Sequence, residues 1–224
     1  MNTVFDTEDV PLETYAQSAE ISVAQSVYSE GDIWGRPKTL TSDNYFDHSP
    51  RIEAFENSAM LTRIKDKDND IFDYSENSND IMFSKWNGTS WSEPQSVISG
   101  VDTVVNSSLV YKGDEGVYAY TIDTDNDMFT AEDREIYIVK WDGSEWSTPQ
   151  RLTTNEVIDS NPQGAYIDGQ LILAWYQDGK IVYLNDINQS VPDTVDFIQT
   201  AQEDFTLTGD SKGNVALIYT EPVQ

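Results

Sequence analysis

Short runs of alternating apolar and polar residues recur along the chain, and turn-forming residues separate them. In one stretch these runs cover residues 104–111, 116–122, 135–141 and 146–152. Alternation with a period of two is typical of β-strands that bury one face. The Asp142-Gly143 pair between the last two runs predicts a tight hairpin, because both residues tolerate a positive φ. The pattern therefore predicts four antiparallel strands in this stretch.

The same pattern is found one unit earlier along the chain. The run Lys-Trp-Asn-Gly-Thr-Ser-Trp-Ser-Glu-Pro-Gln at 85–95 returns as Lys-Trp-Asp-Gly-Ser-Glu-Trp-Ser-Thr-Pro-Gln at 140–150, which lies 55 residues later. The acidic run at 66–70 returns at 123–127, which lies 57 residues later. The proline near the end of each repeat indicates that the last strand is an outer one. Four-stranded antiparallel units of about this length are typical of β-propeller blades.

We therefore expect an all-β protein, a β-propeller of four-stranded antiparallel blades with about four blade equivalents. Residues 1–18 are expected to form an N-terminal segment and 19–224 the propeller, with a half blade at 19–42, blades at 43–100 and 101–157, a degenerate blade at 158–203 and a half blade at 204–224. Pairing of the N-terminal with the C-terminal strands could close the ring, since closure removes exposed edges. The alternatives are a segment of a larger propeller, or self-association with a second copy.

Composition narrows the range of partners. The chain has 40 Asp and Glu against 13 Lys and Arg, a formal net charge of -27, so nucleic acid and direct membrane insertion are both disfavoured. No run approaches the ~18 apolar residues that a membrane-spanning helix needs. Without cysteine and with His48 as the single histidine, thiolate sites and a Ser-His-Asp triad are disfavoured. The N-terminal residues show no signal peptide, but an excised domain or a mature fragment would also lack one. We expect an extracellular or cell-surface location.

The acidic runs are the candidate metal sites. Alternating carboxylates on a looping backbone can converge on one hard cation, and calcium accepts six to eight oxygen ligands. Calcium is therefore the expected cofactor, with a structural role, and a solvated acidic hairpin loop is the alternative. The predicted ligands are Asp66, Asp68, Asp70 and Asp80 in the first repeat, and Asp123, Asp125, Asp127 and Glu135 in the second.

The tryptophans occupy repeat-equivalent positions, which indicates packing between blades. The alternative is that some of these rings stack on sugars in grooves between blades, since an indole offers a large apolar face. The candidates for ligand stacking are Trp86, Trp91, Trp141 and Trp146.

The Trp-Asp-Gly-Ser-Glu-Trp-Ser-Thr-Pro run at 141–149 resembles the Asp-box region of sialidase-like propellers, and also blades of bacterial propeller lectins. The Asp-box pattern of Ser or Thr, Asp, Gly and Trp is approximated at 29–34, 86–91 and 141–146. In those families the Asp box is structural and lies away from the ligand. The resemblance therefore implies the fold more than an activity.

A sialidase-like hydrolase would need an arginine cluster, a tyrosine nucleophile and an acid/base aspartate. The arginines are scattered along the sequence, and Arg51 in Ser-Pro-Arg-Ile only faintly resembles the arginine motif of that family. We therefore expect no catalytic residues and no enzyme, but a binding, adhesion or scaffold module that presents a face to a surface protein or glycan partner. The alternatives are a glycan-binding, lectin-like module and a sialidase-like glycoside hydrolase domain.

Overall fold

The computed structural model describes residues 20–23, 26–29, 32–34, 38–69, 77–125, 127, 129–188, 192–195, 198, 200–209 and 214–220. Every regular element in these ranges is a β-strand. None of the described residues belongs to a helix that could cross a membrane.

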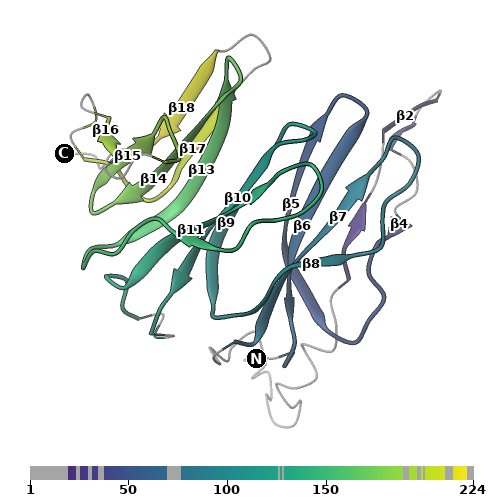
Figure 1. Ribbon diagram of the computed structural model, residues 1–224, viewed down its shortest axis with the longest axis horizontal. Coiled ribbons are helices and arrows are strands. Elements are labelled where there is room, and N and C mark those ends of the chain that lie inside the picture. The colour runs from purple at the N-terminus through teal and green to yellow at the C-terminus, as the bar shows by residue number, and fades with distance from the viewer. Residues whose placement is uncertain are drawn as a thin grey trace, which may run out of the picture.

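Three four-stranded antiparallel sheets form the body of the protein, and within each sheet the strands follow the order of the chain (Figure 1). The first sheet consists of β5 (Phe46–Phe55), β6 (Ser58–Asp66), β7 (Asn79–Trp86) and β8 (Gln95–Val101). The second consists of β9 (Val104–Tyr111), β10 (Gly116–Asp123), β11 (Arg134–Trp141) and β12 (Gln150–Arg151). The third consists of β13 (Asp159–Ile167), β14 (Gln170–Gln177), β15 (Lys180–Leu184) and β16 (Asp193–Thr194). The predicted four-stranded blades are confirmed, and the protein is a β-propeller.

Shorter strand pairs flank the three complete blades. At the C-terminal side β17 (Phe205–Gly209) pairs with β18 (Val215–Tyr219). At the N-terminal side β1 (Ser22–Val23) pairs with β4 (Lys38–Thr39), and β2 (Ser26–Ser29) pairs with β3 (Asp32–Trp34). The pairing of N-terminal with C-terminal strands that would close the ring is not formed by the described strands. The two groups lie at opposite ends of an arc, with three complete blades between them (Figure 1).

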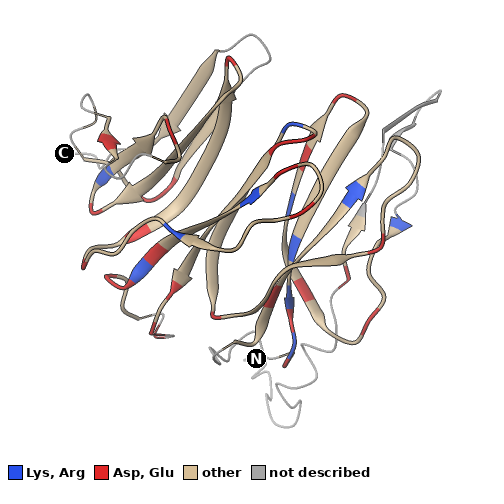
Figure 2. Ribbon diagram, viewed as in Figure 1, with Lys and Arg blue, Asp and Glu red and all other residues tan. Residues whose placement is uncertain are grey.

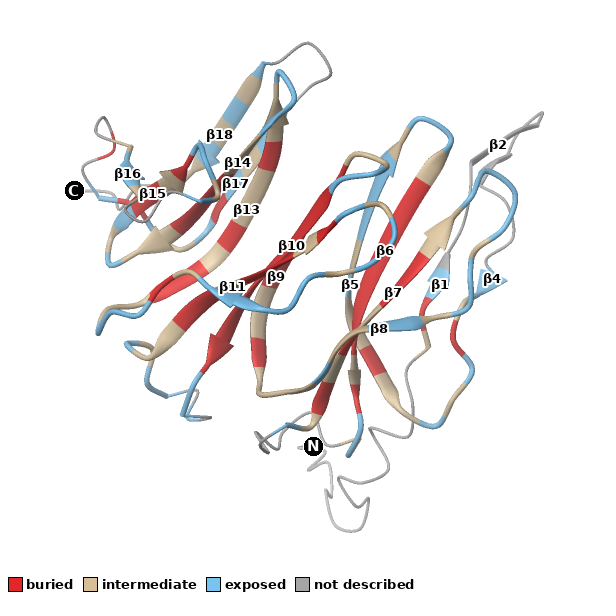
Figure 3. Ribbon diagram, viewed as in Figure 1, coloured by how far each residue is buried: buried red, intermediate tan, exposed pale blue. Residues whose placement is uncertain are grey.

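The core lies between blades because the two faces of each sheet contact different neighbours. On β10, the rings of Tyr118 and Tyr120 pack against the first blade, whereas Val117 and Ala119 pack against the third. Successive side chains of a strand point to opposite faces, so the alternation of this strand supplies both interfaces. All eight residues of β10 are buried, and Figure 3 shows this strand in the middle of the arc.

The innermost strands of the blades are β5, β9, β13 and β17, and each lies beside the next along the inner side of the arc. This inner side is called the channel below, and the described strands do not close it into a ring. Figure 2 shows that Asp and Glu gather in the turns and at the strand ends of all three complete blades. The acidic charge is therefore carried mostly around the rim, and the interfaces between blades are apolar.

Gly164 allows β13 to approach β9 closely, because a Cβ at this position would clash with Cγ2 of Val110. We expect Gly164→Ala to lower the free energy of unfolding by about 1–3 kcal/mol, as overpacking does in a well-packed core. Chemical denaturation of the single and double variants measures the effect. In a Val110→Ala background the same substitution should cost little, and an equal cost in both backgrounds would contradict this account of the glycine.

Candidate functional site

Two β-bulges shape the channel end at which the inner strands begin. The ladder of β5 shifts register between His48 and Arg51, and that of β13 shifts between Ser160 and Gln163. In each bulge a residue with positive φ (49° at Ser49, 50° at Asn161) precedes a proline, which has no N–H to donate. Bulges redirect side chains, and they occur often beside active sites.

A chain of hydrogen bonds links the third blade to its neighbours at this end. The backbone N–H of Asn161 donates to Oδ1 of Asn106 over 3.0 Å, and the hydroxyl of Thr121 donates to the same oxygen over 2.6 Å. The Asn161 side-chain amide donates to the carbonyls of Glu203 and Phe205, at 2.8 and 3.0 Å. The beginnings of β9, β13 and β17 are thereby tied together.

Glu203 and Arg51 carry the charge of this network, and neither side chain is fully buried. The Ser160 hydroxyl donates to Oε1 of Glu203 over 2.5 Å. Arg51 donates from Nε to the carbonyl of Ser107 over 2.7 Å, which connects β5 to β9. Arg51 also donates from Nη1 to the carbonyl of Pro50 over 3.3 Å. Among the described residues Arg51 forms no ion pair with a carboxylate.

Two other carboxylates near this end are engaged within the protein. Asp47 is buried and forms an ion pair with Arg63. Asp159 is buried and accepts hydrogen bonds from the Trp175 indole, the Gln177 amide and the Asn155 amide, at 2.8, 2.8 and 2.7 Å. Burial raises the pKa of Asp159, and the three donors act in the opposite direction. The contacts of Asp47 and Asp159 hold the first residues of β5 and β13 in place.

The opposite mouth of the channel contains a cavity of about 390 Å³. It is lined by the far ends of β5, β9, β13 and β17, and its charged residues are Glu53, Lys112 and Asp168. The Lys112 ammonium lies 5.4 Å from the ring centroid of Tyr166, which also lines the cavity.

The two acidic loops differ in what they bring together. In the first loop Asp66 accepts from the backbone N–H groups of Asp68 and Asn69, at 3.1 and 3.2 Å. Burial, followed by the neighbouring Asp68, raises the pKa of Asp66 to about 6. Asp80 instead pairs with Lys67 at 3.0 Å and accepts from the Gly100 N–H at 2.8 Å. Asp70 lies outside the described residues.

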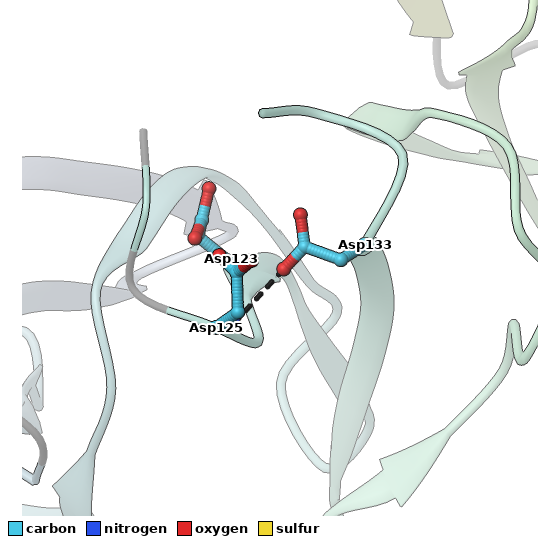
Figure 4. A group of neighbouring side chains, drawn as sticks. All are labelled: Asp123, Asp125 and Asp133. Carbon is cyan, nitrogen blue, oxygen red and sulfur yellow. Dashed lines mark hydrogen bonds between the residues drawn. The ribbon is translucent and has the colours of Figure 1, made fainter. Parts of the chain in front are cut away.

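In the second loop three carboxylates converge, and only two of them are among the predicted ligands. Asp123, Asp125 and Asp133 each offer an oxygen within 4.8 Å of the others (Figure 4). Asp127 instead accepts from the Phe129 N–H over 3.1 Å. Glu135, with 1% of its side chain exposed, pairs with Arg151 over 2.7 Å.

The strand ladder shows why Asp133 was missed. Asp123 pairs with Arg134 across the β10–β11 ladder, so the residue before Arg134 lies next to the end of β10. In the first blade Asp66 pairs with Asn79, which places Ser78 at the equivalent position. Asp133 is not among the predicted ligands because those residues share the repetition of the acidic runs, and the first repeat has Ser78 at the position of Asp133.

The tryptophans proposed to stack on ligands lie in two turn pairs. Trp86 and Trp91 have ring centroids 5.9 Å apart, and Trp141 and Trp146 have centroids 5.5 Å apart. Trp141 is 5% exposed and contacts Phe83 of the preceding blade at 5.5 Å. This placement fits packing between blades. The side chain of Trp34 lies outside the described residues.

The Asp-box-like turn is held by Asp142. Its Oδ1 accepts from the Ser144 N–H, the Ser144 hydroxyl and the Glu145 N–H, at 2.9, 2.8 and 2.9 Å. Asn87 makes the equivalent contacts with the N–H groups of Thr89 and Ser90, both at 2.9 Å. The repeated motif thus fixes the turn between the third and fourth strands of a blade.

No protein-family model matches the chain, and no curated protein sequence matches it. Solved structures do share its architecture. An α-L-arabinanase from Penicillium chrysogenum matches with a TM-score of 0.56 and 11% identity, over 81% of this chain and 63% of its own. A Fusarium graminearum α-L-arabinofuranosidase gives 0.55 and 14%, over 81% and 62%. A Trypanosoma rangeli sialidase gives 0.59 and 15%, over 93% and 40%. The chain has the propeller fold of these glycosidases.

The resemblance to sialidase-like propellers is thereby confirmed at the level of the fold. The chain spans less than two thirds of the length of each of these proteins. The expectation of a non-catalytic binding or adhesion module is wrong, because the propellers that the chain resembles are glycoside hydrolases. The fold places Arg51 of the first blade beside the Ser107 carbonyl of the second blade.

Proposed function

We propose that this chain forms part of a glycoside hydrolase of the propeller type, which binds carbohydrate at the channel end where β5, β9, β13 and β17 begin. One observation carries the proposal: polar groups from several blades meet there, with Arg51, Asn106, Asn161 and Glu203 linked across the inner strands. Amide, guanidinium and carboxylate groups are those that bind sugar hydroxyls. The glycosidase neighbours support the same assignment.

Glu203 supplies one of the two carboxyl groups that glycoside hydrolysis requires. It is the carboxylate of this network that stays accessible, because Asp47 and Asp159 are buried and already paired. The hydroxyl of Ser160 orients Glu203 by donating to Oε1, so the other carboxylate oxygen is left for substrate or water. Arg51 holds the sugar through its remaining N–H donors.

The cavity at the other mouth is the competing location, since it too contains carboxylates. The cavity is also lined by several blades, but the groups of the polar network are joined by hydrogen bonds between inner strands of different blades. These groups come together only when the blades pack side by side, which is typical of a site positioned by a scaffold. The Glu53 carboxylate belongs to the cavity, and a variant there separates the two locations.

The proposal is tested by turnover of an aryl α-L-arabinofuranoside and an aryl sialoside by the full chain. We expect hydrolysis of one of them and a loss of about 10²–10⁴-fold in kcat for Glu203→Gln, because the substitution removes a proton-transferring group. Glu53→Gln changes the same functional group at the other mouth and should leave kcat unchanged. Absence of turnover on both substrates, or equal activity of Glu203→Gln and the parent, would overturn the proposal.

A further inference from the structure

The turn between β10 and β11 gathers three carboxylates from three different positions of the hairpin. Asp123 is the last residue of β10, Asp125 lies in the turn, and Asp133 directly precedes β11. Oδ2 of Asp133 accepts from the N–H groups of Thr124 and Asp125, at 2.8 and 2.9 Å. The turn is therefore folded around Asp133, and one oxygen of each aspartate lies within 4.8 Å of the others (Figure 4).

The buried carboxylate of Asp123 provides a second and separate observation. Its side chain is 0% exposed, and Oδ1 has no hydrogen-bond partner in the described part of the chain. Oδ2 reaches Nε of Arg134 only at 3.5 Å. Oδ1 of Asp133 is likewise buried and lacks a hydrogen-bond partner among these residues. Leaving a buried carboxylate oxygen without a donor is costly, so these oxygens point to a ligand that neutralises them.

We propose that this turn binds one calcium ion through Asp123, Asp125 and Asp133. Three carboxylates beside the guanidinium of Arg134 leave an excess of negative charge that a divalent cation balances. The donor set is all oxygen and contains no histidine or cysteine, which disfavours zinc and copper. Calcium tolerates the irregular geometry of such a turn, whereas magnesium demands near-octahedral coordination.

The corresponding turn of the first blade does not gather three carboxylates in its described residues. Ser78 occupies the position of Asp133, and Asp80 is already paired with Lys67. The proposal therefore assigns the ion to the second blade. It also replaces the ligand expected from the repeat, Glu135, with Asp133.

Thermal unfolding of the full chain, with CaCl₂ or MgCl₂ at a fixed high ionic strength, tests the site. At a calcium concentration near 100 times Kd we expect a rise in Tm of about 5–10 °C, because a ligand that binds only the native state stabilises it by mass action. Equal MgCl₂ should give a smaller rise. Calorimetric titration with calcium should show this site as a binding event that Asp133→Asn removes.

Matched variants separate a specific site from general relief of repulsion. Asp133→Asn and the exposed Asp125→Asn should both lose the calcium-specific rise in Tm. Asp127→Asn removes the same charge from the same turn and should keep the rise. No difference between calcium and magnesium, or an equal loss in Asp127→Asn, would overturn the proposal. If Asp133→Asn fails to fold, the comparison of Asp125→Asn with Asp127→Asn decides between a specific calcium site and general relief of repulsion.

Discussion

Arg63→Met is expected to lower the free energy of unfolding by about 3–5 kcal/mol, the usual cost of removing one partner from a buried ion pair. The Arg63 and Asp47 side chains are 3% and 0% exposed, so the substitution strands the Asp47 carboxylate in the interior. The pair joins the start of β5 to β6, next to the first bulge. Urea denaturation at neutral pH measures the effect.

The double variant Asp47→Leu with Arg63→Met provides the control. Replacing both charges with apolar groups of similar size is often close to neutral, because no unpaired charge remains. We therefore expect the double variant to recover most of the stability that the single variant loses. A single variant within about 1 kcal/mol of the parent protein would show that the pair is not desolvated as the structure describes.

The second large effect is expected at Trp175, which is 1% exposed between the second and third blades. Trp175→Ala should cost about 3–5 kcal/mol, since it opens a cavity and also removes the indole N–H that donates to Asp159. Trp175→Phe keeps most of the buried area but not the donor, and should cost about 1–3 kcal/mol. Denaturation curves for both variants separate the contribution of packing from that of the hydrogen bond to Asp159. Equal losses in the free energy of unfolding would contradict the role of packing at this site.

The blades could be predicted from the sequence because each one is a local structure. The alternation of apolar residues and the turns at Asn87-Gly88 and Asp142-Gly143 each act within a single meander. The offset of 55 residues then shows that the same meander is repeated. The predicted calcium ligands illustrate the limit. Asp123 and Asp125 were found by their repetition, but Asp133 depends on the register of a hairpin, which a list of repeated residues does not contain.

The polar network at the channel was harder to predict because its contacts cross between blades. Arg51 and Ser107, or Asn106 and Asn161, are brought together only when successive inner strands lie side by side. The matching Asp-His-Ser-Pro and Asp-Ser-Asn-Pro runs at 47–50 and 159–162 were visible in the sequence, but a period of two gives no sign of a bulge. Calcium binding, an extracellular location and a surface partner remain predictions.

The arc of blades has a consequence for how the protein unfolds. In the described part of the chain the main contacts between blades join neighbouring blades, and one apolar cluster lies at each of these interfaces. Stability in such an array is approximately a sum of nearest-neighbour terms, as in linear repeat proteins. The blade of β9–β12 packs against a complete blade on each of its two faces. The strands before β5 and the pair β17–β18 have fewer packing partners in the described part of the chain. Cooperativity should therefore be greatest in the middle of the chain, and partial unfolding should proceed from the two ends of the arc toward β10.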